Sequence, residues 1–239
     1  MSERADLLRR LHQRRPLVLP NAWDAASART FADAGFPAVA TSSAAVAATL
    51  GYDDHEAAPV DDVLAAIART TRAVDVPVTA DFESGFGLTP TEIVERLLDA
   101  GAAGCNLEDT DHATGDQRPV EVQVERLGAV AEAAAGRLVL NARVDTYLRG
   151  EPDDEAAITR ARAYLAAGAD CAYPIGYLDE ATVGRLTAAV DGPLNVLAWK
   201  DAPPVARLGE LGVARVTFGG GLFREVQDRL AARAQELLP

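Results

Sequence analysis

Eight short apolar runs alternate with eight amphipathic stretches along this chain of 239 residues, and the alternation limits the possible folds more than any other feature. The apolar runs have the length of strands that are buried on both faces of a parallel sheet. The stretches between them carry apolar residues at helical spacing, as helices packed on a sheet do. Strict strand–helix alternation over eight repeats is typical of a (β/α)8 barrel of the TIM type, which we therefore predict.

The apolar and amphipathic runs set the expected elements. The predicted strands cover residues 17–21, 38–43, 76–83, 104–110, 138–145, 170–176, 194–199 and 214–219. The predicted helices cover residues 25–35, 60–74, 90–101, 120–136, 154–168, 179–190, 203–212 and 222–238, with an extra helix at 3–14 before the first strand. No linker or repeat divides the chain, so we expect residues 1–239 to form one barrel domain. A doubly wound sheet is the alternative, but no GxGxxG follows the first predicted strand.

Polar side chains gather at the ends of four consecutive predicted strands, the second to the fifth. They are Ser42 and Ser43, Asp81 and Glu83, Glu108 and Asp109, and Arg143 and Asp145. The active site of a TIM-type barrel lies at the C-terminal ends of its strands, so we expect these side chains to share one mouth. Carboxylates in that position predict a cage of oxygen ligands for a hard divalent cation, formed by Asp81, Glu83, Glu108 and Asp109.

Arg143 has both a functional and a structural interpretation. An arginine at a strand end can bind a carboxylate or a phosphate through two hydrogen bonds. The same guanidinium could instead form a salt bridge with Glu108 or Asp145, and both interpretations hold if the pair exists only when no substrate is bound. The segment FGGG at residues 218–221 also has two interpretations. It could bind a phosphate, or it could allow close packing of a strand against a helix.

We expect the three histidines, and Asp54 in the loop after the second predicted strand, to face solvent. His12 is predicted on the solvated face of the first helix, and His55 and His112 lie in predicted loops. Asp54 belongs to a run of acids in the segment LGYDDHEAAP, for which a solvated loop is the simplest explanation.

Composition excludes several classes of partner. The formal net charge of −13 leaves no basic stripe for nucleic acid. No segment is apolar over a length that spans a bilayer, and the N-terminus lacks the apolar core of a signal peptide, so we expect a cytoplasmic protein without membrane contact. Cys105 and Cys171 each lie in a predicted strand and are expected to be buried thiols rather than a disulfide.

Four segments in order, TSSAAVAATLGYDD, TADFESGFG, GCNLEDT and NARVD, resemble the isocitrate lyase/phosphoenolpyruvate mutase superfamily, in particular its phosphoenolpyruvate mutase-like branch. The resemblance runs from about Pro20 to Phe223 and implies Mg²⁺-dependent chemistry, with Mn²⁺ as a substitute, on a small anionic 2-oxo or enolpyruvyl acid. The metal ligands that it implies, directly or through water, are Asp81, Glu83, Glu108 and Asp54. The substrate contacts that it implies are Ser42, Ser43, Ala44 and Arg143, the last also supplying catalytic positive charge.

The chain departs from the superfamily pattern at two places. Glu83 stands where the pattern usually has the second aspartate of an Asp-x-Asp pair. The loop after the fourth strand, DTDHATGDQRP, lacks both the cysteine of the lyases and the lysine of the mutases, and Cys105 lies too early to replace that thiol. His112 and Asp116 are then the loop residues that we expect to transfer protons.

Three functions follow from the resemblance. The leading hypothesis is a Mg²⁺-dependent lyase or hydrolase that cleaves a C–C bond in a small 2-oxo or 2-hydroxy acid through a pyruvate-enolate-like or oxalate-like intermediate. The first alternative is a phosphonate enzyme of the phosphoenolpyruvate mutase or phosphonopyruvate hydrolase type. The second alternative is a catalytically silent barrel that binds metal and anion.

The resemblance also implies self-association. Members of the superfamily commonly form tetramers from pairs of dimers that exchange their last helix. We expect a homo-oligomer, a dimer or a tetramer, although the chain ends soon after its last predicted helix, which argues against a complete exchange.

Overall fold

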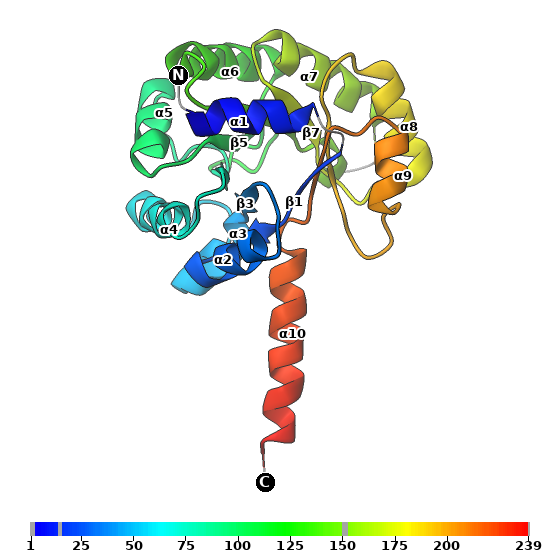
Figure 1. Cartoon of the computed structure of the whole chain (residues 1–239). Helices are drawn as coiled ribbons and strands as arrows, with labels where there is room; N and C mark the ends of the chain where they lie inside the picture. Colours follow the sequence, from blue (N-terminus) through cyan, green and yellow to red (C-terminus); the bar gives the residue numbers. More distant parts are fainter. Residues whose placement is uncertain (1–2, 14–15, 150–152, 239) are drawn as a thin grey trace.

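Parallel strands form the centre of the molecule and helices surround them (Figure 1). The computed structural model describes residues 3–13, 16–149 and 153–238. The strands are β1 Leu17–Leu19, β2 Asn21–Ala22, β3 Val39–Thr41, β4 Val78–Asp81, β5 Gly104–Glu108, β6 Val139–Val144, β7 Cys171–Pro174, β8 Asn195–Leu197 and β9 Arg215–Thr217. All paired strands run parallel to each other. Each range that was predicted as a strand contains at least one observed strand.

The strands follow one another around a ring. One sheet has the order β2-β3-β4-β5-β6-β7 and the other has β1-β9-β8. Pro20 alone separates β1 from β2, so these two segments are one predicted strand, and an isolated parallel bridge between Ala172 and Leu194 joins β7 to β8. This sequential order confirms the predicted β/α barrel and rules out the doubly wound alternative, in which the strand order reverses within the sheet.

The helices alternate with the strands as expected, with one addition. They are α1 Glu3–His12, α2 Ala25–Asp33, α3 Ser43–Leu50, α4 Val60–Arg72, α5 Pro90–Asp99, α6 Val120–Ala134, α7 Asp154–Ala166, α8 Glu180–Ala189, α9 Val205–Glu210 and α10 Gly221–Glu236, with a short 3-10 helix at Thr146–Leu148. Helix α3 was missed because its run of alanines has no amphipathic pattern. Ser42 caps it, since its hydroxyl accepts a hydrogen bond from the Ala45 N–H at 3.4 Å.

Helix α1 closes the N-terminal end of the barrel. Its residues Ala5, Leu8 and Leu11 form a buried cluster with side chains of β1, β3 and β6. The prediction that His12 is solvated is wrong, because the same packing buries it to 7% exposure and its ring contacts the Leu8 carbonyl oxygen at 2.9 Å. Burial lowers the pKa of His12 to about 4, so its ring is neutral near pH 7. Arg14, the expected last residue of this helix, lies outside the described residues.

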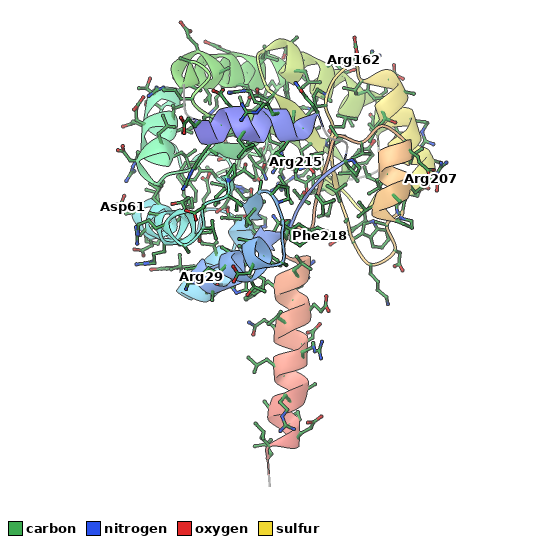
Figure 2. All side chains as sticks on the ribbon, viewed as in Figure 1. Arg29, Asp61, Arg162, Arg207, Arg215 and Phe218 are labelled. Atoms are coloured by element: carbon green, nitrogen blue, oxygen red, sulfur yellow. The ribbon has the colours of Figure 1, made fainter. Side chains whose placement is uncertain are left out.

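The interior and the surface of the barrel carry their charges differently (Figure 2). Asp61, Arg162 and Arg207 project from the outer helices, whereas Arg215 of β9 lies inside and is fully buried. The Arg215 guanidinium donates to the side-chain oxygen of Asn106 across the barrel at 3.3 Å. An arginine inside a strand carried no sequence signal of its own, so this internal cation was not predicted.

Helix α10 leaves the barrel rather than packing on it (Figure 1). None of its residues is buried, and Val226 and Leu230 are 48% and 60% exposed.

Cys105 and Cys171 are buried thiols without a disulfide, as predicted. Within the described residues, no helix combines the length and the apolar character that crossing a membrane requires.

The neighbouring leucines Leu7 and Leu8 of α1 provide a matched test of how the barrel end is closed. We expect Leu8→Ala to lower the free energy of unfolding by about 2–5 kcal/mol, because Leu8 is fully buried. Leu7→Ala removes the same atoms from a side chain that is 37% exposed and should change it by about 0.5 kcal/mol or less. Urea denaturation measures both values, and equal losses would mean that α1 does not seal the barrel as described.

Candidate active site

The register of β5 and β6 sets Glu108 beside Arg143 at the C-terminal mouth. Arg143 Nη1 lies 2.5 Å from Glu108 Oε2, and Arg143 Nε donates to Asp145 Oδ1 at 2.6 Å. Glu108 and Asp145 are 2% and 1% exposed. Burial alone would lower the pKa of Arg143, but the carboxylates of Asp145 and Glu108 outweigh it and leave that pKa raised. The structural interpretation of Arg143 therefore holds in this state, and the guanidinium is fixed at the mouth.

Asp81 ties the ends of β3 and β4 together. Its Oδ2 accepts hydrogen bonds from the Ser43 backbone N–H and hydroxyl, both at 3.1 Å. The Asp81 N–H in turn donates to the Thr41 hydroxyl at 2.9 Å. These contacts orient one carboxylate oxygen and leave the other, Oδ1, buried with no hydrogen-bond partner among the described residues.

Glu83 turns back into the mouth directly after β4. Its backbone φ is 47°, in the left-handed region, and its Oε2 accepts the Glu56 N–H at 2.5 Å. Burial, followed by the charges of Asp54 and Asp81, raises the pKa of Glu83 to about 8. Glu83 therefore holds a proton near pH 7 unless a positive charge binds beside it.

The acids at the mouth fit a divalent cation. Asp54 is half-buried rather than fully solvated, and its Oδ1, like Asp81 Oδ1, is buried without a hydrogen-bond partner in the described part of the chain. Glu83 and Glu108 lie close enough to these acids for like charges to raise their pKa values, although burial is the larger cause for both. Oxygen atoms that are buried, unpartnered and mutually repelling are the ligands that Mg²⁺ and Mn²⁺ take.

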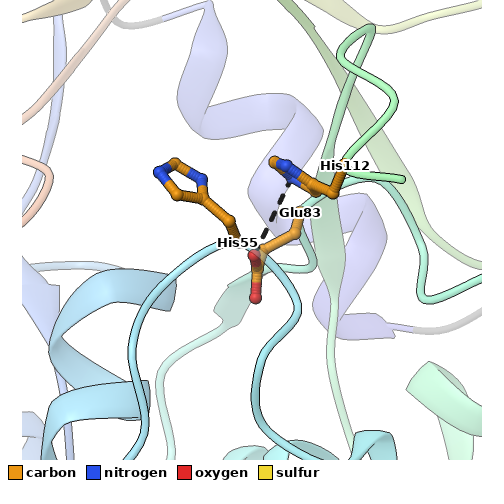
Figure 3. A group of neighbouring side chains, drawn as sticks. All are labelled: His55, Glu83 and His112. Carbon is orange, nitrogen blue, oxygen red and sulfur yellow. Dashed lines mark ion pairs between the residues drawn. The ribbon is translucent and has the colours of Figure 1, made fainter. Parts of the chain in front are cut away.

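Two histidines enter the same cluster (Figure 3). His112 Nε2 forms an ion pair with Glu108 Oε1 and lies 3.9 Å from Glu83 Oε2. The His55 and His112 rings have centroids 5.1 Å apart. Burial lowers the pKa of His112, but the close contact with the Glu108 carboxylate and its charge outweigh burial, so that pKa is raised. Sequence reasoning named His112 for its place in the loop but left His55 as a surface residue.

Asp109 does not join the cage. Its Oδ2 accepts from the Tyr164 hydroxyl at 2.7 Å and from Arg160 Nη1 at 3.1 Å, so the side chain faces α7. Its Oδ1 accepts the Asp145 N–H at 2.9 Å. The earlier expectation for Asp109 is wrong because adjacent residues at the strand end point in opposite directions, one into the barrel and one to the helix layer. Asp109 anchors the base of the loop after β5.

Asp116 is exposed at the far side of that loop. Its backbone carbonyl accepts the Asp111 N–H at 2.8 Å, and its N–H donates to the Thr114 hydroxyl. The structure brings His112 to the carboxylates of the mouth and leaves Asp116 on the loop surface.

The first turn of α3 and the FGGG segment border one region of the mouth. Ser42 is the residue before α3, with Ser43 and Ala44 as its first two positions, and a helix N-terminus of this kind favours an anion. A Cβ on Gly220 would lie at ordinary contact distance from them, 3.8 Å from the Ser42 hydroxyl and 3.9 Å from Ala44 Cβ, and 3.1 Å from Arg224 Nη1. The FGGG segment therefore lies beside the start of α3, which is compatible with both of its interpretations.

Comparison with known proteins places this geometry in a family. A family model described as phosphoenolpyruvate phosphomutase matches residues 8–238. The chain belongs to this family, and so to the isocitrate lyase/phosphoenolpyruvate mutase superfamily. Membership of this family supports the predicted TIM-type barrel. It also means that the protein belongs to a family of enzymes.

Relatives of this family member carry several activities. A 2-methylisocitrate lyase from Halalkalibacterium halodurans is 31% identical over 252 residues, covering 98% of this chain and 80% of that protein. An oxaloacetate decarboxylase from Chromohalobacter salexigens is 31% identical over 213 residues, covering 84% and 73%. The structure of a candidate phosphonomutase from Burkholderia cenocepacia J2315 is 40% identical, with a TM-score of 0.91 over 98% of this chain and all of that chain. Lyase and mutase chemistry therefore both occur among similar proteins.

The protonation of Glu83 gives a pH prediction for protein kept free of divalent cations. Glu83 binds its proton more tightly in the folded state than in the unfolded state, where its pKa is near 4.5. Its contribution to stability is present below pH 4.5 and is lost as the pH rises through about 8. We expect urea denaturation to show this loss, and Glu83→Gln to remove that part of the pH dependence. Glu132→Gln, on the exposed side of α6, is the control, and a Glu83→Gln profile identical to it would contradict the assignment.

Proposed function

We propose that the protein is a Mg²⁺-dependent lyase or hydrolase that cleaves a C–C bond in a small 2-oxo or 2-hydroxy acid through a pyruvate-enolate-like or oxalate-like intermediate, with Mn²⁺ as a substitute ion. The observation that carries the proposal is the meeting of Asp81, Glu83 and Glu108 with Arg143 at one mouth. Negative charge develops on an oxygen when such a bond breaks, and a cation with a guanidinium beside it stabilises that charge. Relatives named as 2-methylisocitrate lyase and oxaloacetate decarboxylase support this reaction class.

The proposal gives each group at the mouth a task. A divalent cation, when bound by Asp81, Glu83, Glu108 and Asp54, would supply Lewis acidity toward the substrate oxygens. Arg143 would hold the substrate carboxylate once it is released from part of its pairing with Glu108 and Asp145. Ser42 and Ser43, with the Ala44 N–H, would orient that carboxylate at the start of α3.

Proton transfer falls to the loop after β5 in this proposal. The carboxylate of Glu108 beside His112 Nε2 raises the His112 pKa and so favours the protonated ring, which would donate to the carbanion-like carbon of the fragment that leaves. Asp116 is the second candidate, but it is exposed and would have to move with the loop tip. We therefore favour His112 for this step.

A phosphonate reaction is the second candidate function, favoured by the description of the matching family and by the Burkholderia neighbour. A phosphonyl group carries more negative charge than a carboxylate and needs additional cations around it. Arg118 is the cation of the loop, but its Nη1 donates to the Thr110 carbonyl at 2.8 Å and its Nη2 lies 3.6 Å from Asp111. Because these contacts already occupy the Arg118 guanidinium, we rank C–C cleavage first.

Calorimetric titration of oxalate, an analogue of pyruvate enolate, tests the proposed function. We expect binding that requires Mg²⁺ and disappears with Asp81→Ala. Arg143→Ala should weaken it by about 2–5 kcal/mol, the usual loss for a buried charge-assisted contact. Arg185→Ala, which removes an ion pair on the outer surface, should bind oxalate as the wild type does.

Oxalate affinity that is equal with Mg²⁺ and with chelator would contradict the proposal. Denaturation curves of each variant ensure that lost binding is not lost folding. A screen of 2-oxo, 2-hydroxy and phosphonate acids then separates the two reactions, because turnover of a phosphonate alone would favour the second candidate.

We also propose that the partner of α10 is a second copy of the chain. The helix carries an apolar stripe that begins at the half-buried Leu222 and continues through Val226 and Leu230, which are 48% and 60% exposed. An exposed helix of 16 residues is marginal by itself and gains stability by burying such a stripe. Cavities of about 670 and 470 Å³ flank its base, with Trp199 and Trp23 among the lining residues. Their lining mixes aromatic side chains with charged ones, so they offer places for single apolar side chains of another copy's α10.

Light scattering after size-exclusion chromatography tests this association. We expect the wild type to be a dimer or a tetramer, and Leu230→Glu to lower its mass because a charge would be buried in the contact. Val122→Glu changes a side chain on α6 that is 50% exposed and should leave the mass unchanged. A monomeric wild type would refute the proposal.

A further inference from the structure

His55, Glu83 and His112 approach one another from three separate segments, the loops that follow α3, β4 and β5 (Figure 3). One ligand atom of each lies within 4.8 Å of the ligand atoms of the other two. Glu83 is buried, His112 is half-buried and His55 is exposed, so the group opens to solvent on one side. An ion could therefore enter without unfolding the loops.

The spacing suits a single ion. Nitrogen and oxygen donors lie about 2.0–2.2 Å from a first-row transition ion, so two donors of the same ion are separated by roughly 3–4 Å. His112 Nε2 and Glu83 Oε2 are 3.9 Å apart, and rotation of the exposed His55 side chain can bring its nitrogen into the same range. Two imidazoles with one carboxylate suit ions such as Fe²⁺, Co²⁺ and Zn²⁺, whereas Mg²⁺ prefers oxygen.

A second observation marks the same place. Glu108 is 2% exposed, yet its Oε1 and His112 Nε2 both lack a properly directed hydrogen bond within the described residues and are held only by their ion pair. Buried donor atoms without a directed hydrogen bond are free to take a metal ion instead, and an ion on His112 Nε2 would lie among these carboxylates.

Backbone strain is concentrated here as well. His55, Glu56 and Glu83 have φ values of 70°, 59° and 47°, and they are three of the five non-glycine residues with positive φ in the described part of the chain. The Glu56 N–H donates to Glu83, so the strained residues hold each other in place. Such strain costs free energy and persists mainly where a site requires that geometry.

We propose that His55, Glu83 and His112 form a nitrogen-donor site for a first-row divalent transition ion, which overlaps the oxygen cage at Glu83. The inference goes beyond the proposed function, because it adds an ion class and a donor set that the oxygen cage does not contain. One nitrogen cannot hold a proton and a metal ion together, so the proton transfer proposed for His112 belongs to the Mg²⁺-loaded state. The two ions then compete for Glu83.

Proton NMR of the Co²⁺-loaded protein tests the site directly, since imidazoles bound to Co²⁺ show strongly shifted, solvent-exchangeable N–H signals. The chain has three histidines, and His12 is buried under α1. We expect two shifted signals in the wild type and one in His55→Asn, because asparagine tolerates the left-handed backbone of this position. The variant should bind Co²⁺ roughly tenfold more weakly or worse.

Asp53→Asn, an exposed neighbour in the same loop, is the control and should keep both signals and the wild-type Co²⁺ affinity. Excess Mg²⁺ should lower the apparent Co²⁺ affinity if the sites share Glu83. Failure to bind Co²⁺, binding without shifted imidazole signals, or two signals in His55→Asn would each overturn the inference. Mg²⁺-dependent oxalate binding is measured separately, so it can succeed or fail independently of this result.

Discussion

Compensation of buried negative charge is the constraint on which the mouth of this barrel depends. The parallel register of β5 and β6 fixes Glu108 beside Arg143, and burial makes each charge costly without the other. Asp81 and Glu83 add two more carboxylates to this end, and the internal guanidinium of Arg215 lies close enough to interact with Asp81. The remaining excess of negative charge is why we propose a divalent cation as the occupant of this mouth.

The loops around the mouth are positioned by the same carboxylates. Ser43 at the start of α3 binds Asp81, and the loop at Glu56 binds Glu83. Asp109 points the other way and fastens the base of the next loop to Arg160. A charge change at a strand end would therefore move its loop as well as alter the site.

The sequence predicted the barrel because the pattern of eight strands and helices repeats along the whole chain, and long periodic patterns are robust. It did not predict α3, whose alanines show no periodicity, or the burial of His12, which depends on α1 packing across the barrel end. Asp81, Glu83 and Glu108 were predicted to converge because strand ends meet in a barrel. His55 is exposed as predicted, but its approach to His112 was not predicted, because a loop residue gives no sign of direction and only the fold brings the two rings together.

The most direct test of the central claim is the position of a cation in a crystal grown with Mn²⁺ and oxalate, located by anomalous scattering at the manganese edge. The account predicts one strong peak at the C-terminal mouth, about 2.0–2.3 Å from a carboxylate oxygen of Asp81 or Glu83, with oxalate between the ion and Arg143. Peaks confined to the acids of the outer helices, with the Glu108–Arg143 pair unchanged, would contradict it.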